Sequence, residues 1–175
     1  MKEFYFVRHG QTDVNTGLLR GDHPHVPLNE IGISQIKRLK ENFPDISFRK
    51  VCRSPMKRVI QTASILLDEA DFSPHDVIEE LSECSWNTWV QMEALNFSLK
   101  EDHSYRELKE FLSRTERATE LLLNNHEPFL VVAHGGIFNA LLHHLDIEWT
   151  YNVNNGELIH FYQDPDWKIK SLFTP

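Results

Sequence analysis

Two short apolar runs dominate the hydrophobic pattern of the chain, and each of them ends in a histidine. Residues 4–7 lead directly into Arg8 and His9, and residues 129–133 lead into His134. An all-apolar run that stops at a turn residue is typical of a strand buried on both faces. If these strands are parallel members of one sheet, both histidines emerge at the same edge, where open α/β sheets bind their ligands.

Apolar residues recur at helical spacing in four further segments. The predicted helices extend from Asn29 to Phe43, from Ser54 to Leu67, from Ser104 to Leu122 and from Gly135 to Leu141. Asn29 is the predicted N-cap of the first helix, and Ser54, followed by Pro55, that of the second. Ser104 and Glu107 form a capping-box pattern at the third. The spacing assigns these residues to the buried faces of the second and third helices: Val59, Ile60, Ala63, Leu66, Leu67, Leu108, Phe111, Leu112, Thr115, Ala118, Leu121 and Leu122.

Shorter strand-like patterns complete the predicted sheet. Residues 48–53 and 77–78 are predicted strands, and residues 79–102 are predicted to be irregular. Residues 158–162 and 167–173 alternate apolar and polar positions across a short Asp-Pro-Asp link, which predicts an antiparallel hairpin at the edge of the sheet. Strands that alternate with helices predict an α/β fold, namely a three-layer α/β/α sandwich with a mostly parallel central sheet.

Composition restricts the classes of partner. The 175 residues contain no repeat or linker pattern, so residues 1–175 are predicted to form one domain. The formal net charge of −8 disfavours nucleic acid and anionic membranes as partners. No apolar run reaches membrane-spanning length, and the run before Arg8 is too short for a signal peptide. Cys52 and Cys84 suggest neither a disulfide framework nor a zinc site, so we expect a cytoplasmic protein.

The predicted strand ends bring cationic side chains together. Arg8 and His9 end the first strand, while His134 follows the central one. Arg58 lies one turn into the helix that begins near Ser54. Guanidinium groups match the oxygens of a phosphoryl group, and helix N-termini add N–H donors. Because the protein as a whole is acidic, this local cluster predicts a site for a compact dianion, above all phosphate.

An imidazole in such a cluster can attack phosphorus and form a phosphohistidine. Arginines around it would stabilise the charge that spreads over the equatorial oxygens in the transition state. The leaving oxygen then needs a proton, which a carboxylic acid or a third histidine can donate. Glu83 is the candidate donor, although the residues alone do not favour it over Glu79 or Glu80.

Five stretches of the chain resemble, in order, the motifs of the histidine phosphatase superfamily in its phosphoglycerate-mutase-like branch. They are residues 8–15, which begin Arg-His-Gly-Gln-Thr, and residues 27–35, 54–63, 81–83 and 132–136. The resemblance covers nearly the whole chain. It implies phosphomonoester chemistry on an α/β fold without a metal or another cofactor.

The resemblance also implies a role for each matching residue. His9 would be the phosphorylated nucleophile, and Glu83 would be the proton donor. The other groups that would hold the phosphoryl group are Arg8, Asn15, Arg58 and His134. The residues that would line the substrate rim are Gln11, Thr12, Arg20, Gly21 and Gly135.

The chain departs from the family pattern after Glu83. The donor motif is usually followed by a glycine and then a Trp-Glu-Gly run, whereas residues 87–91 read Asn-Thr-Trp-Val-Gln. The cap segment, at about residues 84–104, is much shorter than in the family's mutases, which predicts an open pocket. Between Gly21 and Pro27 there is one extra residue, and the family's aspartate has no clear counterpart there.

These features predict a phosphatase whose substrate is a phosphorylated small metabolite or a phosphoprotein. A mutase must retain its intermediate under a closed lid, which the short cap does not favour. The alternatives are a phosphoglycerate or phosphosugar mutase, and a phosphate-binding member of the family that has lost turnover. The altered segment after Glu83 motivates the last of these.

Several other aromatic and histidine residues have competing interpretations. Trp86 and Trp89 either stack on the substrate or pack against the sheet. The adjacent His143 and His144 diverge on a helix and do not chelate one metal ion together, so the sequence predicts no metal site. The histidines interpreted as surface or structural residues are His75, His103, His126, His143, His144 and His160.

Overall fold

A six-stranded sheet forms the centre of the protein. The computed structural model describes residues 2–19, 21, 23–67, 76–100, 104–148 and 152–175. The strands are β1 (Glu3–Arg8), β2 (Val51–Arg53), β3 (Asp76–Val77), β4 (Leu130–Ala133), β5 (Leu158–Gln163) and β6 (Trp167–Phe173), in the order β3-β2-β4-β1-β5-β6. The first four strands in this order pair in parallel. The pairings of β1 with β5 and of β5 with β6 are antiparallel. The predicted mostly parallel sheet with an edge hairpin is therefore confirmed.

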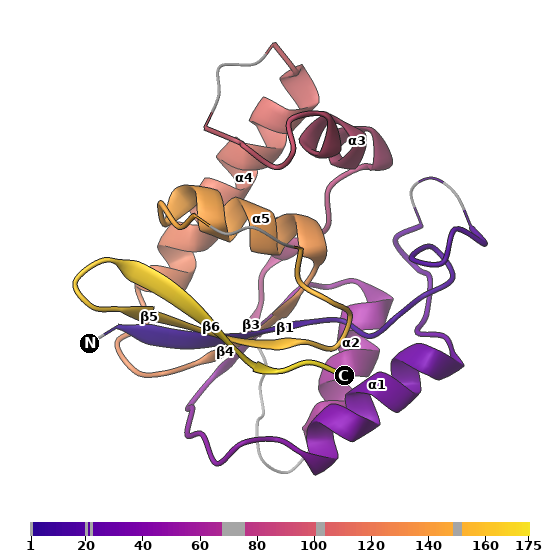
Figure 1. The fold of residues 1–175 in the computed structure, drawn as a ribbon, viewed down its shortest axis with the longest axis vertical. Coiled ribbons are helices and arrows are strands. Elements are labelled where there is room, and N and C mark those ends of the chain that lie inside the picture. Colours follow the sequence, from indigo (N-terminus) through magenta and orange to yellow (C-terminus); the bar gives the residue numbers. More distant parts are fainter. Residues whose placement is uncertain (1, 20, 22, 68–75, 101–103, 149–151) are drawn as a thin grey trace.

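Helices cover both faces of this sheet (Figure 1). Helices α1 (Glu30–Glu41) and α2 (Lys57–Leu66) lie on one face, while α4 (Arg106–Leu123) and α5 (Gly135–His144) lie on the other. Helix α3 (Trp86–Ala94) packs against α4. Successive residues of β1 alternate between the two cores: Tyr5 and Val7 contact the α1–α2 layer, whereas Phe4 and Phe6 contact the other. The three-layer sandwich predicted from the sequence is confirmed.

The strand register aligns the carboxyl ends of β1, β2 and β4. Arg8 pairs with Ala133, and Arg53 pairs with Val132. The helix that follows β1 lies on one face of the sheet, and the helix that follows β4 lies on the other. The crevice between two such strands is where open α/β sheets bind ligands. The fold therefore places its candidate site beyond Arg8 and Ala133.

The helix starts agree with the sequence at one of three predicted caps. The Asn29 side chain accepts a hydrogen bond from the Gly32 N–H at 2.9 Å, so the predicted cap of α1 is confirmed. The Ser54 cap is wrong, because α2 begins only at Lys57 and the Ser54 hydroxyl contacts His134. The capping box is also wrong. Helix α4 begins at Arg106, and the Glu107 carboxylate accepts a hydrogen bond from the Ser85 hydroxyl at 3.1 Å instead.

Fewer apolar residues of α2 and α4 are buried than their spacing predicts. Ile60 and Leu121 are 40% and 50% exposed, so their assignment to the core is wrong. Threonines occupy part of the inward faces instead. Thr62, Thr115 and Thr119 are buried because each hydroxyl donates to the carbonyl oxygen four residues earlier.

The segment predicted to be irregular contains two helical elements. A short 3₁₀ helix, η1, covers Glu79–Leu81, and α3 follows it. Ser85 caps α3, since its hydroxyl accepts a hydrogen bond from the Thr88 N–H at 3.1 Å. The two predicted strands before this segment are also shorter or shifted, with β2 limited to Val51–Arg53 and β3 to Asp76–Val77.

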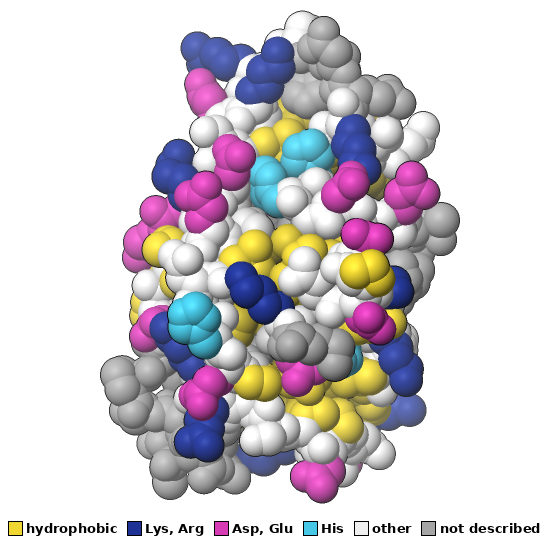
Figure 2. All heavy atoms as spheres, turned by 90° about the vertical axis from the view of Figure 1, so that its left-hand side faces the viewer, with side chains coloured by type: hydrophobic (Ala, Val, Ile, Leu, Met, Phe, Trp, Pro, Cys, Tyr) yellow, Lys and Arg dark blue, Asp and Glu magenta, His cyan; other side chains and the backbone are white. Residues whose placement is uncertain are grey.

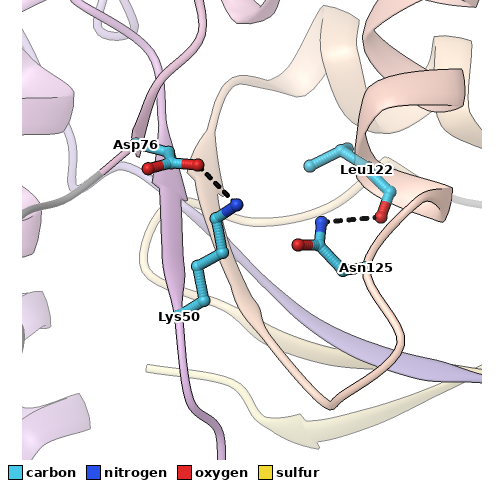
Figure 3. A network of polar contacts seen from close by, with 4 residues as sticks. All are labelled: Lys50, Asp76, Leu122 and Asn125. Atoms are coloured by element: carbon cyan, nitrogen blue, oxygen red, sulfur yellow. Dashed lines mark hydrogen bonds and ion pairs between the residues drawn. The ribbon is translucent and has the colours of Figure 1, made fainter.

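Polar contacts close the amino end of the sheet, away from the candidate site. The Lys50 ammonium lies 2.5 Å from the Asp76 carboxylate, and this ion pair joins the residue before β2 to β3 (Figure 3). The Asn125 side chain donates to the Leu122 carbonyl oxygen at 2.8 Å at the end of α4.

Basic and acidic side chains are interspersed on the face drawn in Figure 2. Among the described residues, no helix combines the length and apolarity needed to cross a membrane.

The Asn29 cap gives a prediction about stability. We expect Asn29→Ala to lower the free energy of unfolding by about 1 kcal/mol, because the Gly32 N–H loses its acceptor. Asn29→Ser retains an acceptor and should lose less. Urea unfolding followed by circular dichroism measures the difference. Lys37→Ala is the control, because Lys37 is exposed within α1 and caps neither end; equal losses in the Ala and Ser variants at position 29 would contradict the assignment of the cap.

Candidate active site

His9 lies at the centre of the strand ends with a defined tautomer. Its Nδ1 is 2.7 Å from the Gly10 carbonyl oxygen, which only accepts, so Nδ1 carries the hydrogen. Its Nε2 is 3.2 Å from the Nε–H of Arg58, which only donates, so Nε2 keeps its lone pair. Burial, together with the charges of Arg58 and Arg8, holds the pKa of His9 well below its usual value. The ring is therefore a neutral imidazole with a lone pair on Nε2.

Arg8 and His134 each present a buried nitrogen without a hydrogen-bond partner. The Arg8 Nη1 donates to the Val153 carbonyl oxygen at 2.6 Å, while its Nε has no partner. The His134 Nε2 is 2.8 Å from the Ser54 hydroxyl, while its Nδ1 has no partner. The rings of His9 and His134 are 5.2 Å apart. Buried polar groups are normally paired, so these two nitrogens leave hydrogen-bonding capacity unused close to His9, although His134 itself is fully buried and does not line the pocket.

Helix α2 supplies the second guanidinium of the cluster. Arg58 lies in the first turn of α2, is 8% exposed, and donates through Nη1 to the His23 carbonyl oxygen at 3.2 Å. Burial lowers the pKa of both Arg8 and Arg58, and the pKa of His134 is lowered in the same way. A bound anion would relieve this unfavourable concentration of positive charge.

Glu83 reaches the same place from the loop between η1 and α3. One of its carboxylate oxygens accepts the Cys84 N–H at 3.0 Å, and the other accepts the Gly136 N–H at 3.3 Å, in the first turn of α5. A Cβ atom at Gly136 would lie only 2.3 Å from the Glu83 carboxylate, so only glycine allows this approach. The altered segment after Glu83 thus still brings its carboxylate to the strand ends.

Arg114 holds the loop that carries Glu83, and the sequence analysis missed it. From α4, its guanidinium donates to the carbonyl oxygens of Glu80 at 2.8 Å, Ser82 at 2.7 Å and Glu83 at 3.3 Å. These bonds fix the backbone from η1 to Glu83. No motif signals the role, because the acceptors are main-chain atoms that any residue provides.

The loop after β1 is held by amide groups. Asn15 accepts hydrogen bonds through Oδ1 from the Thr12 N–H and hydroxyl, both at 3.0 Å, and from the Asn155 amide at 3.3 Å. Asn155 also donates to the His9 carbonyl oxygen at 2.9 Å, and it lines the pocket although the sequence analysis did not include it. A bond to an acceptor 146 residues away in sequence leaves no local signal.

The predicted rim residues occupy different places. Thr12 and Gly21 line the pocket, whereas Gly135 lies behind Arg8, where a Cβ atom would be 3.3 Å from the guanidinium carbon. Gln11 faces α1 rather than the pocket, since its side-chain oxygen accepts from Asn29 and its N–H donates to Gln35. The remaining rim residue, Arg20, lies outside the described residues.

An open pocket of about 740 Å³ extends from His9. Its inner wall contains Arg8, His9, Arg58 and Glu83. Trp86 and Trp89 form part of the outer wall. Within the described ranges, no group of three His, Cys, Asp or Glu side chains is placed to hold a metal ion. The chemical groups of the inner wall are therefore a neutral imidazole, two guanidinium groups and a carboxylate.

The sequence profile of the histidine phosphatase superfamily (branch 1) matches residues 4–165. The chain belongs to this superfamily. An adenosylcobalamin/alpha-ribazole phosphatase of Salmonella typhimurium is 27% identical over 155 residues, which span 79% of this chain and 76% of the relative.

Solved structures of phosphatases in this superfamily share the fold. An alpha-ribazole phosphatase from Shigella flexneri superposes with a TM-score of 0.75 at 24% identity, covering 98% of this chain and 96% of the other. A phosphoserine phosphatase from Entamoeba histolytica gives a TM-score of 0.73 at 19% identity, covering 99% and 98%. The resemblance of the sequence to the histidine phosphatase superfamily is thus confirmed.

The geometry of His9 predicts its protonation state in solution. At pH 5.5 we expect a neutral ring with the hydrogen on Nδ1, because the pKa is held well below its usual value. A histidine with an ordinary pKa of about 6.5 would be about 90% protonated at that pH. Long-range ¹H–¹⁵N correlation of the imidazole nitrogens measures this, with His9→Gln used to assign the signal. A fully protonated ring at pH 5.5 would contradict the structure.

Proposed function

We propose that the protein is a phosphatase that hydrolyses phosphomonoesters through a covalent phosphohistidine on His9. The observation that carries the proposal is the neutral ring of His9, whose Nε2 keeps its lone pair in a pocket that Arg8, Arg58 and Glu83 also line. Phosphoryl oxygens held by the two guanidinium groups would place phosphorus next to a nucleophile that is already deprotonated. The phosphatases among the relatives and structural neighbours support the same reaction class.

In the first step, the His9 lone pair forms a bond to phosphorus while the bond to the leaving oxygen breaks. Charge on the three equatorial oxygens is stabilised by Arg8, Arg58 and the ring of His134. The Nδ1–H bond to the Gly10 carbonyl oxygen holds the ring in the attacking orientation and stabilises its positive charge in the intermediate. Water then attacks phosphorus, releases phosphate and regenerates the neutral imidazole.

Glu83 is the proposed donor of the proton to the leaving oxygen. Its carboxyl group lines the pocket together with His9, and the Cys84 and Gly136 N–H groups fix its orientation. In its protonated form it serves as a general acid toward an alkoxide leaving group. In the second step the resulting carboxylate takes a proton from the attacking water.

Hydrolysis is favoured over mutase chemistry by the open pocket. The segment of the chain between Glu83 and α4 contains only one helix of nine residues among the described residues. Water therefore has access to the phosphohistidine, whereas a mutase must exclude water while its intermediate is retained. With 3-phosphoglycerate as substrate, isomerisation that exceeds phosphate release would overturn this assignment.

Trapping the intermediate tests the nucleophile. Wild-type protein quenched in base during turnover of a radiolabelled phosphomonoester should carry the label on His9, because phosphohistidine survives base. His9→Ala should carry no label and lose hydrolysis by at least a factor of about 10³. His126→Ala is the matched control, because His126 is exposed and does not line the pocket. Equal turnover by wild type and His9→Ala would disprove the mechanism.

Glu83→Gln tests the proton donor through its dependence on the leaving group. Hydrolysis of an alkyl phosphate should fall by about 10²-fold or more, because the alkoxide leaves without a proton. The first-turnover release of p-nitrophenolate should change much less, since this anion is a good leaving group. Glu79→Gln, an exposed change in the same segment, should behave as wild type with both esters. Equal losses with the two esters would contradict the role.

The clamp by Arg114 predicts a selective loss of turnover. Arg114→Ala should lower kcat for an alkyl phosphate about tenfold, because the loop that positions Glu83 loses three hydrogen bonds. KM should change little, since the guanidinium groups of Arg8 and Arg58 remain in place. Arg117→Ala on the same helix removes an exposed arginine and serves as the control. A rise in KM with unchanged kcat would show that Arg114 does not act through Glu83.

A further inference from the structure

One face of α3 is directed into the pocket. Trp86, Trp89 and Glu93 all line it, and their spacing of three and seven residues places them on the same side of the helix. The opposite side carries Thr88 and Met92, which are buried. Ser85 caps the helix and donates to Glu107 on α4, so this face has a fixed direction.

Trp89 begins next to the phosphoryl-binding groups. A Cβ atom at Gly135 would lie 3.3 Å from the Arg8 guanidinium carbon and 3.4 Å from the tip of the Trp89 ring, so the two side chains border the same glycine. The indole nitrogen of Trp89 donates to the Glu93 carboxylate at 2.8 Å. On its other side the ring packs against Phe97, with centroids 5.6 Å apart at 66°.

The backbone at Phe97, which contacts the Trp89 ring, has an uncommon conformation. Phe97 has φ of +58°, and Asn96 before it has φ of +48°. A bulky residue in the left-handed region costs roughly 1–3 kcal/mol, and such strain persists only where surrounding contacts over-determine it. The Phe97 N–H also donates to the Met92 carbonyl oxygen at 2.9 Å. This backbone ends α3 and places the Phe97 ring in contact with Trp89.

Trp86 continues the wall outward from Trp89. It lies one helical turn earlier and is 48% exposed, although it lines the pocket. Two indole rings thus extend from the phosphoryl-binding end toward the mouth. A pocket of about 740 Å³ is much larger than a phosphate group needs, and it lies in the range of sites that enclose a drug-sized ligand. Val14, Pro24 and Met56 add apolar lining.

We infer that the alcohol part of the substrate carries a planar apolar ring that stacks on the wall formed by Trp86 and Trp89. This inference rests on the proposed function, because the phosphoryl group must be anchored at His9 for the ring to meet this wall. It assigns Trp86 as a specificity-determining residue. Small hydrophilic phosphomonoesters make no stacking contact with either indole and gain nothing from them.

A matched pair of esters tests the inference. Benzyl phosphate and cyclohexylmethyl phosphate have the same number of carbon atoms and both release a primary alcohol, but only the first carries a flat ring. The ratio of their kcat/KM values in wild type should favour benzyl phosphate. In Trp86→Ala this ratio should fall by roughly twofold to tenfold, because ring stacking is lost. Comparing ratios removes the intrinsic difference in reactivity between the esters.

Two variants separate stacking from general disturbance of α3. Trp86→Phe retains a ring and should restore most of the ratio. Val90→Ala truncates an exposed apolar residue of the same helix that does not line the pocket, and it should leave the ratio unchanged. A ratio that is the same in wild type and Trp86→Ala would overturn the inference, even if both esters are hydrolysed.

Binding measurements distinguish this failure from failure of the proposed function. Benzylphosphonate and cyclohexylmethylphosphonate are non-hydrolysable counterparts, and calorimetry gives their affinities without turnover. Benzylphosphonate should bind more tightly than cyclohexylmethylphosphonate, and this difference should be lost in Trp86→Ala and kept in Trp86→Phe. Such a result supports ring stacking even if no ester is hydrolysed. In that case only the proposed hydrolysis is overturned. Equal affinities for the two phosphonates in wild type would overturn the inference that a planar ring stacks on Trp86 and Trp89.

Discussion

The parallel pairing of β1, β4 and β2 determines where the side chains of the candidate site lie. Main-chain hydrogen bonds continue past the strands, from the His9 N–H to the Ala133 carbonyl oxygen at 3.0 Å and from the Ser54 N–H to the Val132 carbonyl oxygen at 3.2 Å. Side-chain packing can tolerate small shifts, but a change of register by one residue turns every side chain to the other face. The positions of His9 and His134 therefore follow from the same constraint that buries the apolar strands.

Electrostatics explain why these groups are held so firmly. Buried guanidinium groups are costly, and both arginines of the cluster depend on main-chain carbonyl oxygens, Arg8 on Val153 and Arg58 on His23. Burial first, and then the same charges, lower the pKa of both imidazoles, which leaves a lone pair available at His9. Positive charge at this site thus has two effects, since it favours a bound anion and adds to the effect of burial on the pKa of His9.

The sequence predicted those parts of the site that local patterns encode. The apolar runs before His9 and His134 specify buried strands, whose parallel pairing brings both histidines to one edge of the sheet. Contacts between distant segments were not predictable in this way. Arg114 and Asn155 bind main-chain oxygens or amides, which carry no residue-specific signal. Ser54 is a residue type that commonly caps helices, but its hydroxyl contacts His134 and α2 begins only at Lys57.

The groups of the candidate site come from both sides of the sheet. Arg58 belongs to the layer of α1 and α2, whereas α4 holds the loop of Glu83 through Arg114 and α5 begins directly after His134. The two layers have separate apolar cores, one containing Ile36 and the other Leu122. The candidate site thus lies where two helical layers meet across one shared sheet. A substitution that loosens one core would act first on the groups that its own layer supplies, which are Arg58 on one side and the loop of Glu83 on the other.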